Sequence, residues 1–355
     1  MSKPTICIVS PALAAANNGN WQTASRWAGF LAPRYDVSIT SAWPEASSAA
    51  APSPPAATPP RDAAAAVSAP DLLIALHARR SASSLAAFRA AHPERPTLLV
   101  LTGTDLYRDI HSDASAQASL AAAHALVVLQ SAGLDELPAA ARPKAHVIYQ
   151  SAPAGAKHPG VRSDIRTQAQ QHEILMIGHL RDEKDPLTFM RAAEVVREPS
   201  ARLVHIGGAL NAALGEAAHA TQNAVAGRYE WLGALPHDQT VDRLRSAHAM
   251  AICSRMEGGA NVIIEAVTSG VPVLASDISG NRGMLGEDYE GYFPLGDAQA
   301  LAALIDRSVS DPAWLQRLRA QCAARAKLFE PATEQAALLA LVDNLLHQNQ
   351  ERPQK

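Results

Sequence analysis

Short apolar runs that alternate with Ala-rich, helix-forming stretches constrain the fold of this chain more than any other feature. Two examples are TICIVS at residues 5–10 and EILMI at residues 173–177. Such runs are typical of strands that are buried on both faces, and their alternation with helices indicates parallel βαβ units. The pattern therefore predicts an α/β fold with doubly wound parallel sheets.

The predicted strands fall into two series separated by residues 157–171, which are polar and lack apolar periodicity. The first series occupies residues 5–10, 35–40, 72–76, 97–101, 125–129 and 146–149, and the second occupies residues 173–177, 201–206, 229–232, 249–253 and 272–275. A chain of 355 residues also exceeds the usual size of one core. We predict an N-terminal Rossmann-like domain at residues 1–160, a C-terminal one at residues 161–330, and a final helix and tail at residues 331–355. Two facing domains imply a ligand cleft between them.

Composition narrows the class of partner. The formal net charge is −3 and the isoelectric point lies near 6.5, so the chain offers no basic surface for nucleic acid. Cys7, Cys253 and Cys322 are far apart and odd in number, which argues against a zinc site or disulfides. Residues 1–11 lack a basic leader, and no stretch is long enough to cross a membrane. We therefore expect a cytoplasmic protein that acts on small molecules, with no membrane partner; the oligomeric state stays open.

The segment most informative about chemistry is SRMEGGANVIIEAVTSG at residues 254–270. Glu257 and Glu265 are separated by seven residues, and two glycines follow the first glutamate. A glycine turn that opens a helix presents unpaired backbone N–H groups and the positive end of the helix dipole, which suit a diphosphate. Two glutamates at this spacing would by themselves be ordinary solvated residues. The apolar strand before them and the AVTSGVPVL segment after them favour a ligand site instead.

This segment resembles the two-glutamate signature of retaining-type GT-B glycosyltransferases, in particular glycosyltransferase family 4. The resemblance implies the GT-B fold of two facing Rossmann-like domains. It also implies that Glu257 faces the transferred sugar and acts in catalysis. Glu265, about two turns along a helix that begins near Ala260, would accept hydrogen bonds from the ribose hydroxyls. The donor diphosphate would be bound at the helix start, by Gly258, Gly259, Ala260 and Asn261.

A second motif, IGHLRDEKDP at residues 177–186, resembles the strand-to-loop segment that faces the donor phosphates in the same family. The resemblance assigns Gly178 to this loop and Lys184 to the departing diphosphate, where it would act in catalysis; an ordinary exposed lysine is the alternative. Relatives carry arginine directly after this glycine, whereas this chain has His179. The phosphate charge would then be met by Arg181 or by a protonated His179.

Polar residues also follow predicted strands in the N-terminal half. The segments are NNGNW at residues 17–21, LHARRSA at residues 76–82 and TGTD at residues 102–105. In open α/β sheets, ligands bind beyond the carboxyl ends of the strands. We therefore predict acceptor-side residues here, although a lone histidine and adjacent arginines are otherwise structural or solvated. They are His77, with a catalytic role, and the acceptor-binding residues Gly19, Asn20, Arg79, Arg80, Thr102, Gly103 and Thr104.

These segments, together with VIYQSA at residues 147–152, resemble the selenosugar synthases of selenoneine biosynthesis over residues 5–296. The resemblance implies transfer of a sugar from a UDP-sugar, with UDP-N-acetylglucosamine as the expected donor, to selenophosphate. The products would be a 1-selenosugar, UDP and phosphate. An anionic selenium nucleophile needs no strong general base, but its phosphate needs cations, which Arg79, Arg80 and Lys157 would supply. The sugar, its anomeric configuration and the use of thiophosphate stay open.

No acidic pair at a strand end suggests a metal, because Asp182 and Asp185 are better explained as polar loop residues around Lys184. We expect no metal or other cofactor. Two other functions stay open. A GT-B glycosyltransferase with a hydroxyl acceptor, a glycan or a small molecule, would share the donor-side residues. A non-catalytic nucleotide-sugar-binding protein would bind without turnover, although the combination of Lys184, Glu257 and Glu265 argues against it.

Overall fold

The computed structural model describes residues 3–13, 19–44, 69–152 and 171–350. The chain divides into two compact units, of which the first contains residues 1–127, 138–146 and 335–355 and the second contains residues 128–137 and 147–334. The boundary that we predict after residue 160 lies outside the described residues, as does most of the Ala-, Ser- and Pro-rich segment after residue 44.

The first unit is built on a six-stranded sheet with the order β2–β1–β3–β4–β5–β6. Its strands are β1 (Thr5–Val9), β2 (Asp36–Thr40), β3 (Leu72–Leu76), β4 (Thr97–Leu101), β5 (Ala125–Val128) and β6 (Ala145–Val147). The pairs of β1 with β2, β1 with β3 and β3 with β4 are parallel. Every residue of β3 and β4 is buried, as their continuous apolar sequences predict.

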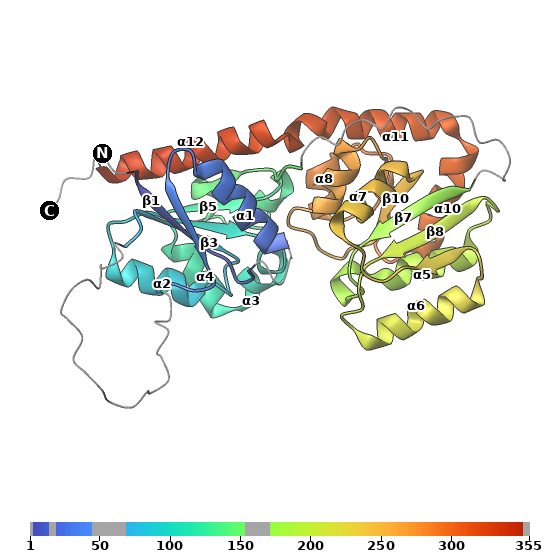
Figure 1. The fold of residues 1–355 in the computed structure, drawn as a ribbon, viewed down its shortest axis with the longest axis horizontal. Helices are drawn as coiled ribbons and strands as arrows, with labels where there is room; N and C mark the ends of the chain where they lie inside the picture. Colours follow the sequence, from blue (N-terminus) through green and yellow to red (C-terminus); the bar gives the residue numbers. More distant parts are fainter. Residues whose placement is uncertain (1–2, 14–18, 45–68, 153–170, 351–355) are drawn as a thin grey trace, which may run out of the picture. The chain divides into compact units, whose positions relative to one another are not determined.

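Helices cover the sheet of the first unit, with α12 on the side opposite to α2 and α4 (Figure 1). The terminal helix that we predict at residues 331–348 is present as α12, and its Asp343 accepts hydrogen bonds from Arg34 and Tyr35. The helical segments are α1 (Gly19–Leu31), α2 (Ala82–Ala91), the π-helical turn η2 (Asp105–Asp109), α3 (Ile110–Ser112), α4 (Ala114–Ala122), η4 (Arg142–Lys144) and α12 (Pro331–Gln350).

The second unit is built on a sheet with the order β12–β11–β10–β7–β8–β9, all paired in parallel. Its strands are β7 (His172–Ile177), β8 (Ala201–Ile206), β9 (Tyr229–Trp231), β10 (Ala249–Ile252), β11 (Val273–Ser276) and β12 (Tyr292–Phe293). We do not predict β12, because two residues are too few to give a periodic signal. The other strands of the chain lie within two residues of their predicted positions.

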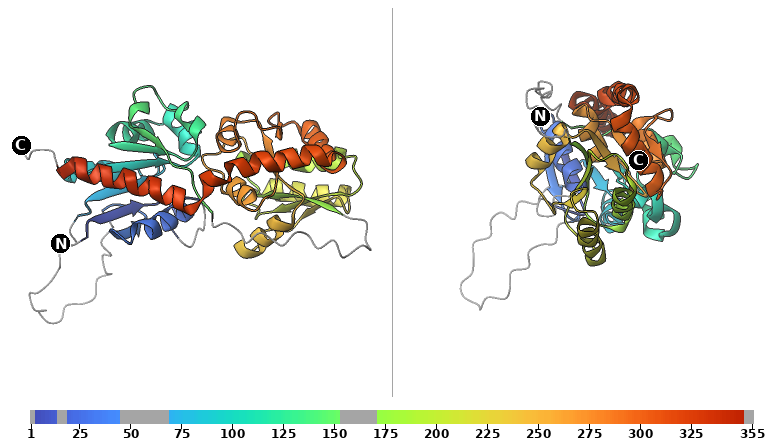
Figure 2. Two further views of the ribbon diagram at one scale, coloured as in Figure 1. Left: turned by 90° about the horizontal axis from the view of Figure 1, so that it is seen from above. Right: turned by 90° about the vertical axis from the view of Figure 1, so that its right-hand side faces the viewer.

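The helices of the second unit also pack in layers (Figures 1 and 2). Helix α5 packs against α10 and α6, and α8 packs against α7 and α11. The helical segments are η3 (Ser131–Leu134), η5 (Asp182–Lys184), α5 (Pro186–Val195), α6 (Ala212–Ala224), α7 (His237–Ser246), α8 (Asn261–Thr268), α9 (Ser279–Leu285), α10 (Ala298–Ser310), α11 (Pro312–Arg325) and η6 (Ala326–Phe329). Among the described residues, none of the helices has both the length and the apolar character that a membrane span needs.

The predicted fold class, α/β with two doubly wound sheets, is confirmed. Because parallel strands end at the same edge of a sheet, residues that follow neighbouring strands are brought together there. In the first unit this edge carries the segments after β3 and β4. In the second unit it carries the segments after β7, β8 and β10. The facing arrangement of the domains and the cleft stay predictions.

Candidate functional site

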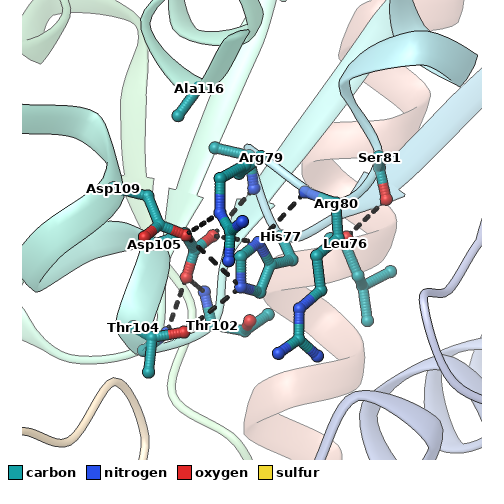
Figure 3. Close-up of polar contacts among 12 residues, drawn as sticks. Leu76, His77, Arg79, Arg80, Ser81, Thr102, Thr104, Asp105, Asp109 and Ala116 are labelled. Carbon is teal, nitrogen blue, oxygen red and sulfur yellow. Dashed lines mark hydrogen bonds and ion pairs between the residues drawn. The ribbon is translucent and has the colours of Figure 1, made fainter. Parts of the chain in front are cut away.

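His77 follows β3 in the first unit and has a left-handed backbone with a φ of 73°. A side chain other than glycine is strained in this region, and such strain is concentrated at functional sites. The imidazole is buried, with its Nδ1 3.3 Å from the backbone N of Arg80 and its Nε2 3.2 Å from Oγ1 of Thr104. Nδ1 accepts from the Arg80 amide, so the proton of the neutral ring is on Nε2, directed toward Thr104 (Figure 3).

The charge state of His77 follows from its surroundings. Burial lowers the pKa of His77; Asp105 and Asp109 oppose this effect, whereas Arg80 and Arg79 add to it. The imidazole is therefore a neutral donor to Thr104. It is not a cation in the neutral pH range.

Asp105 holds together the segments that follow β3 and β4. Its side chain is fully buried, and its two oxygens accept from the backbone N–H groups of Ala78, Thr102 and Gly103 at 2.9, 3.0 and 2.9 Å. The amides of the predicted acceptor residues Thr102 and Gly103 are thus already paired. The TGTD segment is held in place by its own aspartate, and this leaves the side chains of the edge for a ligand.

Asp109, at the end of η2, holds two arginines with one carboxylate. Oδ2 accepts from Nε of Arg79 at 2.8 Å, and Oδ1 accepts from Nε of Arg108 at 3.2 Å. Burial alone would raise the pKa of Asp109, but the hydrogen bonds from the two arginines outweigh it, and the pKa lies below its usual value. Sequence reasoning missed Arg108 and Asp109, since nothing in LYRDI distinguishes them from solvated helix residues.

The other predicted acceptor-side residues are placed less tightly. Gly19 and Asn20 form the first turn of α1, after the carboxyl end of β1. Arg80 follows Arg79 in the turn between β3 and α2 and is exposed, and its guanidinium has no ion pair within the described part of the chain. Lys157 lies outside the described residues.

In the second unit, Gly178 and His179 follow β7 and pack against the end of β8. A Cβ at Gly207 would lie 1.9 Å from the carbonyl oxygen of Gly178, so this approach requires glycine. His205 lies beneath, with Nε2 3.1 Å from the same carbonyl oxygen. His179 accepts at Nδ1 from the amide of Gly208 at 3.1 Å, which is the role of an unprotonated nitrogen.

His179 and Arg181 are the two predicted sources of charge for the donor phosphates. Nδ1 of His179 is occupied as the acceptor of the Gly208 amide, so this nitrogen is not available to donate to a phosphate. Arg181 is exposed, and its guanidinium has no hydrogen bond or ion pair with any residue that the structure describes. Of the two, Arg181 is better placed to supply a positive charge.

Lys184 and Glu257 form an ion pair at the carboxyl edge of the second sheet. Nζ of Lys184, at the end of η5, lies 2.5 Å from Oε1 of Glu257, in the loop after β10. The two side chains are 17% and 10% exposed. The alkyl stem of Lys184 lies over Gly178, where a Cβ would meet it at 3.6 Å. Residues 73 positions apart are thus brought together, as their predicted shared site requires.

The glycine turn between Glu257 and α8 is packed closely on both sides. A Cβ at Gly259 would lie 2.8 Å from Cβ of Leu129, and a Cβ at Gly280 would lie 2.2 Å from the carbonyl oxygen of Glu257. Helix α8 begins at Asn261, with Ala260 as its N-cap residue. The positions of Gly258, Gly259, Ala260 and Asn261 directly before and at a helix start agree with the sequence prediction.

Glu265 lies closer to the helix start than we predict. It is the fifth residue of an eight-residue helix, and at about 3.6 residues per turn the four residues from Asn261 make about one turn rather than two. Its carboxylate is partly buried and accepts from Nε2 of His237, the first residue of α7, at 2.9 Å. His237 is a further residue that sequence reasoning missed, since a histidine after proline carries no motif.

Neither unit contains a cluster of side chains suited to a metal among the residues that the structure describes. Cys7, Cys253 and Cys322 are all buried. Asp185 binds the exposed Arg255 at 3.1 Å and accepts from Thr188 at 2.8 Å, and so has a structural role in the loop around Lys184.

Residues 161–329 match the family model of "Glycosyl transferases group 1". This segment is therefore similar to the group 1 glycosyl transferases. Lys184, Glu257 and Glu265 all lie within it, so the donor-side residues that we predict fall in the matched segment. The acceptor-side residues lie outside the matched segment.

Curated relatives match only part of the chain. The D-inositol 3-phosphate glycosyltransferase of Streptosporangium roseum is 28% identical over 193 residues, which cover 51% of this chain and 43% of that protein. The putative teichuronic acid biosynthesis glycosyltransferase TuaC of Bacillus subtilis is 26% identical over 155 residues, 43% of this chain and 37% of that protein. The matched part thus spans less than half the length of these relatives.

Solved structures match nearly the whole chain. Anabaena HepE in complex with UDP and glucose has a TM-score of 0.72 and 16% identity, covering 96% of this chain and 100% of that one. Sucrose-phosphate synthase from Thermosynechococcus elongatus has a TM-score of 0.76 and 18% identity, covering 98% and 100%. At these identities the likeness shows the fold, and the predicted GT-B fold class is confirmed.

Proposed function

We propose that this chain is a glycosyltransferase that takes a sugar from a nucleotide diphosphate donor bound by the segment that matches the family model. The observation that carries the proposal is the Lys184–Glu257 pair, which lies beside Gly178 and directly before the glycine turn of α8. A cation, a helix start and a carboxylate at one sheet edge match the needs of a diphosphate and a sugar. Glu265, on the next turn of the helix, is the candidate ligand of the ribose.

The finer proposal is that the donor is a UDP-sugar, with UDP-N-acetylglucosamine as the first candidate, and that the acceptor is selenophosphate. Support comes from the resemblance to selenosugar synthases and from the arginines at the edge of the first unit. Arg79 is held by a buried carboxylate and Arg80 has no described ion pair, so both can receive a phosphate-type anion. Burial lowers the pKa of His77 and so makes it a weak base, which fits a reaction that requires no strong one.

In the proposed reaction, a selenium lone pair forms a bond to the anomeric carbon as the bond from that carbon to the UDP oxygen breaks. UDP leaves with the electron pair, and Lys184 and the α8 start would stabilise its charge. Water then attacks phosphorus, the P–Se bond breaks, and phosphate and a 1-selenosugar remain. We propose that no metal takes part and that the substrates are the only small molecules needed.

A hydroxyl acceptor is the second candidate. The curated relative from Streptosporangium roseum is named for D-inositol 3-phosphate, an acceptor that carries both hydroxyl groups and a phosphate. The arginines of the first unit would suit the phosphate of such a molecule equally well. A nucleotide-sugar-binding protein without turnover remains the third candidate and predicts donor affinity alone.

The test measures UDP release from UDP-N-acetylglucosamine by the purified protein under anaerobic conditions with chelator present. Selenophosphate, thiophosphate and inositol phosphate are supplied in separate reactions, followed by product mass. Release that depends on selenophosphate, with selenium in the sugar product, supports the finer proposal. Release only with a hydroxyl acceptor supports the second candidate, and UDP binding without release with any acceptor supports the third.

A further inference from the structure

The two arginines that pair with Asp109 use the same atom of the guanidinium group. Each guanidinium uses Nε, at 2.8 Å for Arg79 and 3.2 Å for Arg108, and each takes a different carboxylate oxygen. Within the described residues, the Nη atoms of these two arginines make no hydrogen bond or ion pair. A guanidinium held at Nε still presents the edge formed by its two Nη groups, which is the edge that binds phosphate in a bidentate manner.

The carboxylate is buried and the guanidinium groups are exposed. The side chain of Asp109 is 6% exposed, whereas those of Arg79 and Arg108 are 40% and 50% exposed. The anchoring group thus lies on the protein side and the donor groups reach the solvent. Each arginine binds one oxygen of the same carboxylate, so the carboxylate holds both positive charges beside it despite their mutual repulsion.

The other nearby carboxylates accept hydrogen bonds from backbone amides, although Asp113 also attracts Arg79 electrostatically. Asp105 accepts from three backbone amides, and Asp113 accepts from the amide of Ala116 at the start of α4. Neither one occupies the Nη groups of the arginines. The Asp109 carboxylate is therefore shared between two cations, and an incoming oxyanion would complete their coordination.

His77 fixes the turn from which one of these arginines arises. Its Nδ1 accepts from the amide of Arg80, and its left-handed backbone directs the chain from β3 into this turn (Figure 3). The imidazole is neutral, so it supports the turn without adding charge. Its Nε2 also lies 3.9 Å from Oδ2 of Asp109, which places the histidine and the carboxylate together beneath the arginines.

We propose that Arg79 and Arg108 form an oxyanion clamp and that Asp109 is the positioning residue that holds it open. The ligand is a tetrahedral oxyanion of the phosphate type, free or as part of a larger acceptor. The inference deepens the proposed function and rests on it for the identity of the acceptor. Binding of inorganic phosphate tests the clamp without turnover, so the two can fail separately.

The experiment titrates the full chain with inorganic phosphate by calorimetry, in the presence of UDP to fill the donor site. We expect Arg108→Ala to weaken phosphate binding about tenfold, as for the loss of a charge-assisted hydrogen bond. Arg108→Lys should restore part of this loss. Arg34→Ala is the matched control, because Arg34 also pairs with a single aspartate on the same unit. It should bind phosphate as the wild type does.

Asp109→Asn separates positioning from simple charge. Loss of a negative charge would by itself strengthen anion binding, whereas loss of a positioning carboxylate should weaken it several-fold. Transfer assays should then show a raised acceptor KM with an unchanged donor KM. Thermal unfolding identifies a variant that does not fold, and the exposed Arg108 variants then decide the outcome. Wild-type phosphate affinity in Arg108→Ala, or tighter binding in a folded Asp109→Asn, would overturn the clamp.

The clamp and the proposed reaction would fail with different experimental results. If phosphate binds and depends on Arg108 but no sugar is transferred to any phosphate-type acceptor, the clamp stands and the proposed reaction fails. If selenophosphate is used but Arg108→Ala leaves both phosphate affinity and acceptor KM unchanged, the reaction stands and the clamp is wrong.

Discussion

In the first unit a buried carboxylate holds the arginines from behind, whereas in the second unit a carboxylate binds the lysine at the atom that a ligand would contact. Asp109 takes Nε of Arg79 and Arg108 and leaves their Nη groups, while Glu257 takes Nζ of Lys184. The first edge is organised for an anion before one arrives. In the second edge an anion must compete with a partner that is already bound.

The same contrast extends to Glu265. Its carboxylate, the candidate ribose ligand, accepts from Nε2 of His237. All three key donor-side residues, Lys184, Glu257 and Glu265, are therefore paired within the protein; the Lys184–Glu257 pair is largely buried, and in the other pair His237 is exposed. Donor binding would exchange these partners, and only the difference in interaction energy contributes to affinity.

Replacement of Lys184 tests whether its pair with Glu257 is more than a structural ion pair. We expect Lys184→Ala to lower kcat for UDP release by about two to three orders of magnitude, because a donor to the developing charge is lost. Arg80→Ala should act on acceptor KM with little change in kcat. Turnover near the wild-type rate in Lys184→Ala would mean that the second edge does not hold the donor phosphates.

The pH dependence of stability tests the support beneath Gly178. Burial lowers the pKa of His205 to about 4, and the hydrogen bond to the Gly178 carbonyl only partly opposes this. Between pH 6.5 and about 4 the unfolded chain therefore takes up a proton that the folded chain does not. As the pH is lowered across this window, the free energy of unfolding decreases, by about 3 kcal/mol from this residue.

His205→Gln keeps a donor for the carbonyl and removes the titration. We expect the free energy of unfolding of the variant to fall less steeply than that of the wild type when urea denaturation is compared at about pH 7 and about pH 4.5. The pKa values of His77 and His248 are also lowered by burial, so the variant should still lose some stability in acid. An equal loss of unfolding free energy between the two pH values in variant and wild type would contradict the burial of a neutral His205.

Gly280 tests how tightly the Glu257 loop is positioned. A Cβ would lie 2.2 Å from the carbonyl oxygen of Glu257, so Gly280→Ala must shift backbone. We expect a loss of about 1–3 kcal/mol in unfolding free energy and a matching loss of transfer activity. Gly29→Ala is the control, because nothing lies within 4 Å of its Cβ position in α1, and it should stabilise by up to about 1 kcal/mol.

His237 carries the smallest expected effect. Its ring is 69% exposed, and exposed pairs contribute about 0.2–1 kcal/mol. We therefore expect His237→Ala to change the Kd of UDP less than fivefold, with kcat unchanged. A change of more than tenfold would show that His237 contacts the nucleotide directly. The second edge would then also be organised for its ligand, as the first edge is.

The strands and the donor-side motif could be predicted from the sequence because both have local signals. Apolar runs such as those of β3 and β8 identify buried strands, and the glycine turn with its two glutamates identifies the start of α8. The partners of these residues could not be predicted in the same way. Lys184 and Glu257 are 73 residues apart, and only the parallel sheet brings them within 2.5 Å.

Arg108, Asp109 and His237 show where sequence reasoning ends. Arg108 and His237 are exposed on helical turns, where charged residues are common and carry no periodic signal. Asp109 is buried, but it directly follows Arg108 on the same turn, and no pattern in the sequence marks it. Their interest comes from side-chain geometry: which nitrogen of an arginine is used, and which carboxylate is already bound. The roles that we predict for the acceptor-side residues stay predictions for the same reason.

The two carboxylates should have opposite effects on anion binding, and a pair of titrations measures both effects. UDP is titrated into Glu257→Gln, with Glu183→Gln from the neighbouring loop as control, and inorganic phosphate is titrated into Asp109→Asn. We expect UDP to bind several-fold more tightly to Glu257→Gln, because Lys184 is released. We expect phosphate to bind several-fold more weakly to Asp109→Asn, because the arginines lose the group that positions them. Tighter anion binding in both variants would contradict this expectation, because charge alone would then explain the two sites.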